Sequence, residues 1–139
     1  MKALSVHPYF AMSIVVGIKT VELRTWKTEY RGDILICSTA KKCHGTIPSH
    51  ALGVVTLADI VPFNRKKHLE AADVKPGELN KNFEGFAWIL ENPRIIKPVP
   101  VKGKLSLWDF DGEIEYLPKP QTEEEDAELD RIYWAPIVI

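Results

Sequence analysis

Short apolar segments with the composition of β-strands, separated by glycines and prolines, most restrict what this sequence can fold into. Residues 33–39 and 51–61 are rich in Val, Ile and Leu, and their length favours buried strands. Residues 2–6, 21–26 and 83–90 have similar character, and polar and apolar residues alternate in 21–26. Such spacing favours an antiparallel barrel or sandwich, because closing a sheet removes its exposed edges. We therefore predict a mainly β fold with five or six strands.

Helices are expected to be few and short, which makes the fold class α+β. Pro8 suits the first position of a helix, and Gly17 suits its end. The two turns between them would not be stable alone, so this helix must dock on an apolar surface. A second short helix is predicted over 65–72, and Asn92-Pro93 predicts a turn between strands.

Length and composition favour one compact domain. The chain has 139 residues, 45% of them hydrophobic, which is enough for one sizeable core. No stretch approaches the roughly 18 to 20 apolar residues that span a membrane, and the start lacks the apolar core of a secretory signal. We therefore expect a cytoplasmic protein without a membrane partner. Cys37 and Cys43 do not form a common disulfide or zinc pattern, so reduced thiols are expected.

Charge is divided unevenly along the chain. Residues 1–110 carry 16 Lys or Arg against 10 Asp or Glu, whereas 111–139 carry two against nine. A basic body suits a polyanion such as nucleic acid, although ordinary domains also reach this excess. The acidic stretch from Glu123 to Asp130 could lie near the basic surface and compete with nucleic acid; a solvated helix is the favoured alternative. The apolar residues after it, 133–139, are expected to fold back onto the body or meet a partner.

Candidate binding residues gather on the polar face of the strand predicted after Gly17. Glu22, Arg24 and Trp26 share this face, and basic and aromatic side chains follow. Charged and aromatic residues together can neutralise phosphates and stack on bases. Alternatively, Glu22 and Arg24 form an ion pair and Trp26 caps the core. Taken alone, the residues favour this second interpretation.

Other chemistry finds little support. Four scattered histidines specify no catalytic triad, and Cys43, His44 and His50 have no known metal-ligand spacing, so no metal is expected. All eight glycines are isolated, which excludes a phosphate-binding glycine-rich loop. No cofactor is expected.

A motif of the form Gly-x-Lys-x-x-Glu-x-Arg is formed by Gly17, Lys19, Glu22 and Arg24. With the residues around it, this motif resembles the signature of the ASCH (activating signal cointegrator homology) family of the PUA-like superfamily. The likeness covers about residues 3–110 and is strongest to the coactivator-type ASCH domain. Further matching segments are Pro8-Tyr-Phe-Ala11, Ile14, Trp26, Tyr30-Arg-Gly32, Ala40-Lys41-Lys42, Trp88-Ile-Leu-Glu-Asn-Pro93, Val99-Pro-Val-Lys-Gly103 and Trp108.

The resemblance implies a PUA-like closed β-barrel with flanking helices, and a cleft between the barrel and the first helix. It also implies binding of RNA or single-stranded nucleic acid. Some small bacterial members hydrolyse N4-acetylcytidine with a Lys, a Thr and a Glu; the Lys corresponds to Lys19, but the Thr falls on Glu22. Strict alternation places Lys19 opposite Glu22 and Arg24, so the three converge only if the chain bends after Gly17.

The sequence thus predicts an ASCH domain over 1–110 and an acidic extension over 111–139 packed on it. The favoured function is a non-enzymatic module for RNA or single-stranded nucleic acid. The alternative is a small amidohydrolase acting on a modified nucleoside such as N4-acetylcytidine, with Lys19 and Glu22 catalytic. Nucleic-acid-binding residues are predicted to be Lys19, Glu22, Arg24, Trp26, Arg31, Lys41, Lys42 and Lys104.

Overall fold

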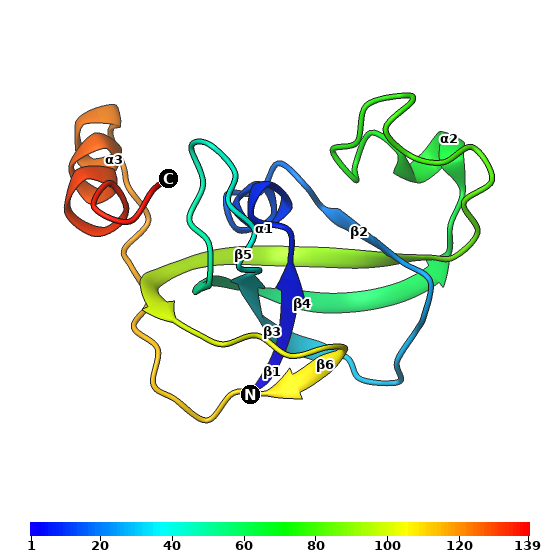
Figure 1. The fold of residues 1–139 in the computed structure, drawn as a ribbon, viewed down its shortest axis with the longest axis horizontal. Helices are drawn as coiled ribbons and strands as arrows, with labels where there is room; N and C mark the ends of the chain where they lie inside the picture. The colour runs from blue at the N-terminus through cyan, green and yellow to red at the C-terminus, as the bar shows by residue number, and fades with distance from the viewer.

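Six strands form a single sheet in the order β2-β5-β4-β3-β1-β6 (Figure 1). The structure is a computed structural model that describes residues 1–139. The strands are β1 (Lys2–Val6), β2 (Val21–Arg24), β3 (Gly32–Ser38), β4 (His50–Pro62), β5 (Phe86–Pro100) and β6 (Leu107–Asp109). Neighbouring strands are antiparallel except β1 and β3, which run parallel. The predicted mainly β class and strand number are confirmed.

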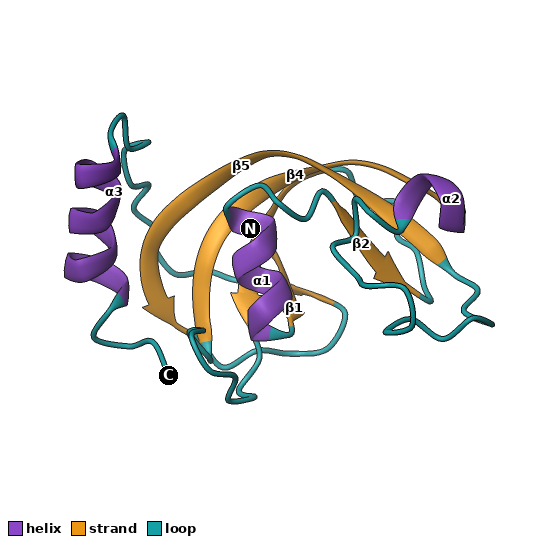
Figure 2. Ribbon diagram, turned by 90° about the horizontal axis from the view of Figure 1, so that it is seen from above, coloured by secondary structure: helices purple, strands orange, loops and turns teal.

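The sheet is curled but open. β4 and β5 have 13 and 15 residues and arch over the molecule (Figure 2). β2 and β6 are the two edges: β2 pairs only with β5, and β6 only with β1. The predicted closed barrel is therefore replaced by an open half-barrel. The edge strands β2 and β6 have only four and three residues, and they do not pair with each other, so the sheet does not close into a barrel.

Helices are short, as predicted. They are α1 (Pro8–Val15), α2 (Arg65–His68) and α3 (Glu123–Leu129), which continues into a π-helical turn, η1 (Asp130–Trp134). Thr122 caps α3 by accepting a hydrogen bond from the Glu125 amide at 3.1 Å, while the Glu125 carboxylate accepts from the Gln121 amide at 2.8 Å. No helix combines the length and apolar character needed to cross a membrane.

The main core lies between α1 and the concave face of the sheet. Ala11, Ile14 and Val15 of α1 are buried against strand residues that include Trp88. In Figure 2, α1 lies beneath the arch of β4 and β5. Trp88 is fully buried on the same face as Leu90, as the alternation in 83–90 predicted. A helix of about two turns is thus held by burial of its apolar side.

The turn predicted at Asn92-Pro93 is wrong, because β5 continues through both residues. Asn92 has a φ of 49°, and the pairing register of β4 with β5 shifts at this point. Asn tolerates the left-handed conformation, so it can form a bulge inside a strand as well as a turn between strands. Here the long partner strand β4 continues past the bulge and decides the outcome.

The last residues of the chain return to the body. Trp134 is 8% exposed and belongs to the main core, with Tyr133 and Ile137 packed against it. The Ile139 amide donates to the Thr46 carbonyl at 2.8 Å. Tyr116 also forms a β-bridge with Ile96 of β5. The division into residues 1–110 and 111–139 stays a prediction.

Candidate functional site

A tight turn after α1 places Lys19 at the centre of the site. Gly17 has a φ of 90°, a conformation that glycine adopts at little cost. The amides of Ile18 and Lys19 both donate to the Ser13 carbonyl at 3.0 Å, which closes the end of the helix. The chain therefore bends before β2 starts at Val21, and this bend brings Lys19 to the same side as Glu22.

Glu22 is the hub of a small network of charged side chains. Its Oε2 accepts two hydrogen bonds from Arg24, from Nε at 3.1 Å and from Nη2 at 2.9 Å. Its Oε1 lies 3.5 Å from Lys19 Nζ. Arg24 Nη2 also donates to the Ser5 carbonyl at 3.0 Å, which ties β2 to β1. The ion pair between Glu22 and Arg24, the structural alternative considered from sequence, is therefore present.

Lys19 is almost completely enclosed, with 2% of its surface exposed. Its Nζ donates to the Ala72 carbonyl and lies 4.5 Å from the centre of the Phe10 ring. Burial lowers the pKa of Lys19, and the negative charge of Glu22 opposes this by favouring the ammonium form. A buried ammonium needs these partners, because desolvation without compensation is costly.

These residues form one wall of a cleft of about 660 Å³, which we call the central cleft. Its aromatic side chains are Phe10, Trp26 and Phe83. Trp26 packs edge-on against Trp88, with ring centres 4.8 Å apart, and its carbonyl accepts the Trp88 indole N–H at 3.2 Å. The complete lining is Ser5, Val6, His7, Phe10, Lys19, Glu22, Leu23, Arg24, Thr25, Trp26, Thr39, Val74, Glu78, Leu79 and Phe83.

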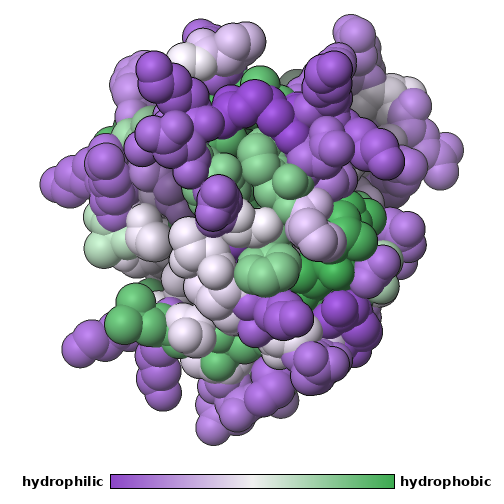
Figure 3. All heavy atoms as spheres, turned by 90° about the vertical axis from the view of Figure 1, so that its right-hand side faces the viewer, coloured by the Kyte–Doolittle hydropathy of each residue, from purple (hydrophilic) through white to green (hydrophobic).

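Charge in the central cleft is balanced. The cations Lys19 and Arg24 face the carboxylates of Glu22 and Glu78 within the same lining. The predicted basic character is therefore not a property of this cleft. Figure 3 views the molecule from the right-hand side of Figure 1, where β2 and α2 lie, and shows apolar side chains gathered in the middle of the face with hydrophilic ones around them.

The other predicted binding residues lie outside this cleft. Arg31 is engaged within its own turn: Nη1 donates to the carbonyls of Thr28 and Tyr30 at 2.7 and 2.9 Å. Lys41 and Lys42 are exposed on the loop after β3 and do not line the cleft. Lys104 lines a neighbouring groove. The structure thus brings Lys19, Glu22, Arg24 and Trp26 together and leaves the remaining four apart.

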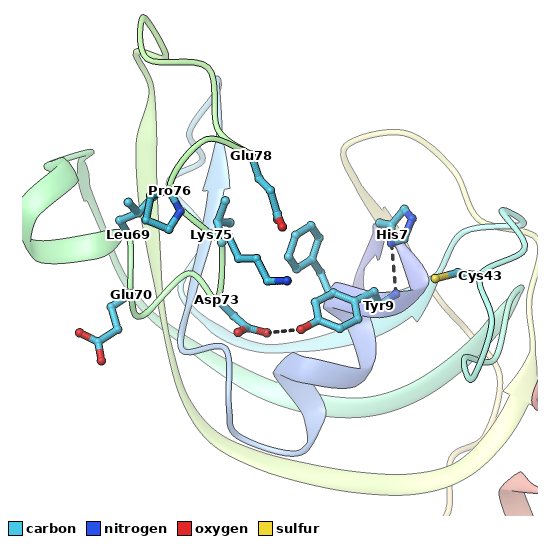
Figure 4. Close-up of a pocket in the computed structure, with 11 residues that line it drawn as sticks. His7, Tyr9, Cys43, Leu69, Glu70, Asp73, Lys75, Pro76 and Glu78 are labelled. Carbon is cyan, nitrogen blue, oxygen red and sulfur yellow. Dashed lines mark hydrogen bonds between the residues drawn. The ribbon is translucent and has the colours of Figure 1, made fainter.

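A second hollow of about 800 Å³, the loop pocket, lies beside the central cleft (Figure 4). Asp73 Oδ2 accepts hydrogen bonds from Tyr9 at 3.1 Å and from Ser13 at 2.7 Å. The hydrogen bond to Asp73, together with its charge, raises the pKa of Tyr9. Figure 4 shows Lys75 reaching toward this pair. The full lining is His7, Tyr9, Phe10, Cys43, Leu69, Glu70, Asp73, Val74, Lys75, Pro76 and Glu78.

The loop pocket was missed by the sequence analysis. Tyr9 was assigned only to the packed helix, and Asp73 lies in a segment without a recognisable motif. Asp73 has a φ of 55°, which marks a fixed turn, but no local pattern reveals that this turn meets α1. His7 and Glu78 were likewise missed, and both line the loop pocket and the central cleft.

A third hollow, the lysine groove, has a volume of about 400 Å³ and adjoins the central cleft on its other side. It shares Ser5 and Thr39 with the central cleft. The groove is lined by Ser5, Ser38, Thr39, Ala40, Ser49, Val101, Lys102, Gly103, Lys104 and Leu105. The three hollows therefore form a continuous series, with the central cleft in the middle.

The acidic helix contributes no residue to any of these three hollows. In Figures 1 and 2, helix α3 lies on one side of the molecule, whereas strand β2 and helix α2 lie on the opposite side. The side chains of α3 are exposed or half-buried, so this helix faces solvent. The predicted position of Glu123 to Asp130 beside the cleft is therefore wrong, and the solvated-helix alternative describes this segment. No group of three or more His, Cys, Asp or Glu side chains is arranged to hold a metal ion.

Comparison with known proteins places this geometry in context. The model of the ASCH domain family matches residues 4–100. Activating signal cointegrator 1 from Homo sapiens is 30% identical over 135 residues, covering 80% of this chain and 22% of that protein. The Mus musculus protein of the same name is 28% identical with the same coverage. The chain thus spans less than a quarter of the length of these relatives.

A solved structure shares the fold. The crystal structure of ASCH from Zymomonas mobilis matches with a TM-score of 0.64 at 20% sequence identity, covering 94% of each chain. A mutant form of the same protein matches with a TM-score of 0.61, also at 20% identity and 94% coverage of each chain. The family match spans well over half of the residues and includes the whole Gly17 to Arg24 motif. This chain belongs to the ASCH domain family, with the curled half-barrel described above.

Proposed function

We propose that this domain binds single-stranded nucleic acid, RNA in the first place, and holds an unpaired nucleotide in the central cleft. The observation that carries the proposal is the network in which the buried Lys19 and Glu22 hold the partly exposed Arg24, beside aromatic side chains in one open cleft. The volume of about 660 Å³ lies in the range of small-ligand sites. Unpaired bases are recognised by stacking and by hydrogen bonds to their edges.

Arg24 is the group best suited to meet the ligand. Its Nε and Nη2 are used by Glu22 and Ser5, whereas Nη1 makes no hydrogen bond within the protein. The side chain is 23% exposed and lines the cleft. An arginine held on one side by a carboxylate presents its remaining donors in a fixed direction to phosphate or to a base acceptor.

Aromatic side chains supply the stacking surface. Trp26 is held by its packing on Trp88, and Phe10 is held on α1 with Lys19 over its ring. Stacking on an aromatic side chain contributes about 1 to 3 kcal/mol per base and tolerates any base. Rigid rings lose little entropy on binding, so this wall favours a flat ligand.

The test is binding of a fluorescein-labelled single-stranded RNA at low and higher salt, with Arg24→Ala as the variant. We expect wild-type binding that weakens with salt, and a loss of about tenfold in affinity in Arg24→Ala, an effect of roughly 1.4 kcal/mol. Arg131→Ala is the matched control, because Arg131 is 76% exposed beside α3. Absence of wild-type binding, or an equal effect of both substitutions, would overturn the proposal.

A second candidate function is hydrolysis of an N4-acylated cytidine, with Lys19 and Glu22 catalytic. The observation that favours it is the burial of Lys19, which lowers the pKa of its amine and favours the neutral form that can act as a base. Incubation with N4-acetylcytidine, followed by chromatographic detection of cytidine, tests this candidate. Turnover that is lost in Lys19→Met would establish the hydrolase, and absence of turnover would exclude this substrate.

A further inference from the structure

The lysine groove differs from the central cleft in having no counter-charge. Its only charged lining residues are Lys102 and Lys104, which are exposed and form no ion pair. Asp109 is held by Lys2 at 3.0 Å. Hydrogen bonding to Lys2 is the first cause of its lowered pKa, and the charge of Lys104 contributes least. The groove therefore presents an uncompensated positive charge.

Ser5 joins the groove to the cleft. Its carbonyl accepts a hydrogen bond from Arg24 in the cleft, and its Oγ accepts one from the Trp108 indole at 3.3 Å. Gly103 lies directly on Ser5: a Cβ at this position would be 2.5 Å from Ser5 Oγ. Because Gly103 has no side chain, the segment that carries Lys102 and Lys104 can lie against β1, next to the residue that binds Arg24.

The floor of the groove carries hydroxyl groups on fixed backbone. The Thr39 amide donates to the Val6 carbonyl, and the Val101 amide donates to the Ser49 carbonyl, both at 2.9 Å. The hydroxyls of Thr39 and Ser49 make no hydrogen bond within the protein. At one end Leu105 is 94% exposed and offers apolar surface. Two ammonium groups and two free hydroxyls match the chemistry of a phosphodiester.

We propose that the lysine groove binds the phosphate backbone of the strand whose unpaired base occupies the central cleft. The proposal rests on the proposed function and narrows it, because the preferred ligand becomes an oligonucleotide rather than a free nucleoside. The balanced charge of the cleft supports a neutral base there, and the net positive charge of the groove supports phosphates beside it. The shared residues Ser5 and Thr39 connect the two positions.

The test compares the full chain with two double variants, using a labelled ten-nucleotide RNA of random sequence. Lys102→Ala/Lys104→Ala removes both groove charges. Lys97→Ala/Lys119→Ala removes two exposed charges outside the groove: the Lys97 amide donates to the Glu115 carbonyl at 2.8 Å, and Lys119 lines a separate hollow with Glu125 of α3. Affinity is measured at several salt concentrations between about 50 and 200 mM.

We expect the groove variant to bind about tenfold more weakly at low salt. The slope of log affinity against log salt should decrease by about 1.4, roughly 0.7 for each lost phosphate contact on a single strand. The control variant should keep the wild-type slope. Wild-type binding with the same slope in both variants would overturn the groove proposal alone. Absence of wild-type binding would overturn the proposed function and the groove proposal with it.

Discussion

The central cleft and the lysine groove share Ser5 and Thr39 but hold their charges in opposite ways. In the cleft, Lys19 and Arg24 both meet Glu22, and Lys19 is 2% exposed. In the groove, the two lysines are exposed and unpaired. A buried charge needs a partner and becomes part of the fold, whereas an exposed charge stays hydrated and free to meet a polyanion. Under the proposed function, the central cleft would therefore recognise the shape of a base, and the lysine groove would attract the charge of the phosphates.

The largest expected effect comes from removing the hub of the cleft. Glu22→Gln leaves Lys19 buried without its carboxylate, so we expect the free energy of unfolding to fall by about 3 kcal/mol, measured by urea denaturation at pH 7. Lys102→Ala in the groove should change it by less than about 0.5 kcal/mol. A similar small change in both variants would contradict the contrast between the two hollows.

The loss in free energy of unfolding caused by Glu22→Gln should also depend on pH. Burial lowers the pKa of Lys19 in the folded protein, and loss of the Glu22 charge lowers it further. The unfolded chain then binds more protons than the folded chain between this pKa and the ordinary value of 10.5, so stability rises with pH in that window. The difference in free energy of unfolding between wild type and Glu22→Gln should therefore be smaller at pH 9.5 than at pH 7. Glu84→Gln, at an exposed position, is the control and should show no such trend.

A smaller effect is expected where the groove meets β1. Gly103→Ala places a methyl group against Ser5 Oγ and should lower the free energy of unfolding by about 2 kcal/mol. Removing the hydroxyl leaves Ser5 Cβ at 3.4 Å, so Ser5→Ala should recover part of the loss in the double variant. A double-mutant cycle measures this coupling. Simple additivity would show that the groove segment does not lie against Ser5.

A still smaller loss of stability is expected from breaking an ion pair that neither hollow uses. Asp33 accepts hydrogen bonds from Arg94 at 2.8 and 2.9 Å, and these are the first cause of its lowered pKa. Asp33→Asn should lower the free energy of unfolding by about 1 kcal/mol at pH 7, because the pair is partly exposed.

This contribution is present above the ordinary pKa of an aspartate, 3.8, and is lost as pH falls through the lower folded value. Wild type and Asp33→Asn should therefore converge in stability below about pH 4 while binding RNA equally at pH 7. Weaker RNA binding by this variant would place the pair inside the binding surface and contradict the assignment of binding to the two hollows.

Local features of the fold could be predicted from the sequence because each depends on nearby residues. Pro8 and Gly17 mark the ends of α1, and alternation in 21–26 gives the polar face of β2. Whether the sheet closes into a barrel could not be predicted from local sequence, because closure depends on whether two edge strands far apart in the chain pair with each other. Asn92-Pro93 was interpreted as a turn, but the same residues also suit a bulge inside a strand. Only the pairing with the partner strand β4 distinguishes a turn from a bulge.

The candidate site was predicted only in part for a related reason. The motif names Lys19, Glu22 and Arg24, and the bend at Gly17 brings them together. Counting charges along the sequence indicated a basic cleft, which the structure does not have. A count gives the sum of the charges but cannot show which of them lie close enough to neutralise each other. Tyr9 and Asp73, 64 residues apart, meet only in the folded chain. Lys102 and Leu105 line the lysine groove because Gly103 packs on Ser5, a contact that the sequence does not reveal.

The most direct test of the division between cleft and groove uses the indole N–H signals of the four tryptophans in a ¹⁵N NMR spectrum. Trp26 lines the cleft, the Trp108 indole donates a hydrogen bond to Ser5 beside the groove, and Trp134 lies in the core at the end of η1. Cytidine at millimolar concentration should shift Trp26 alone among these three, whereas a ten-nucleotide single-stranded RNA should shift both Trp26 and Trp108. RNA binding that leaves Trp26 unmoved, or that shifts Trp134 instead, would contradict the account.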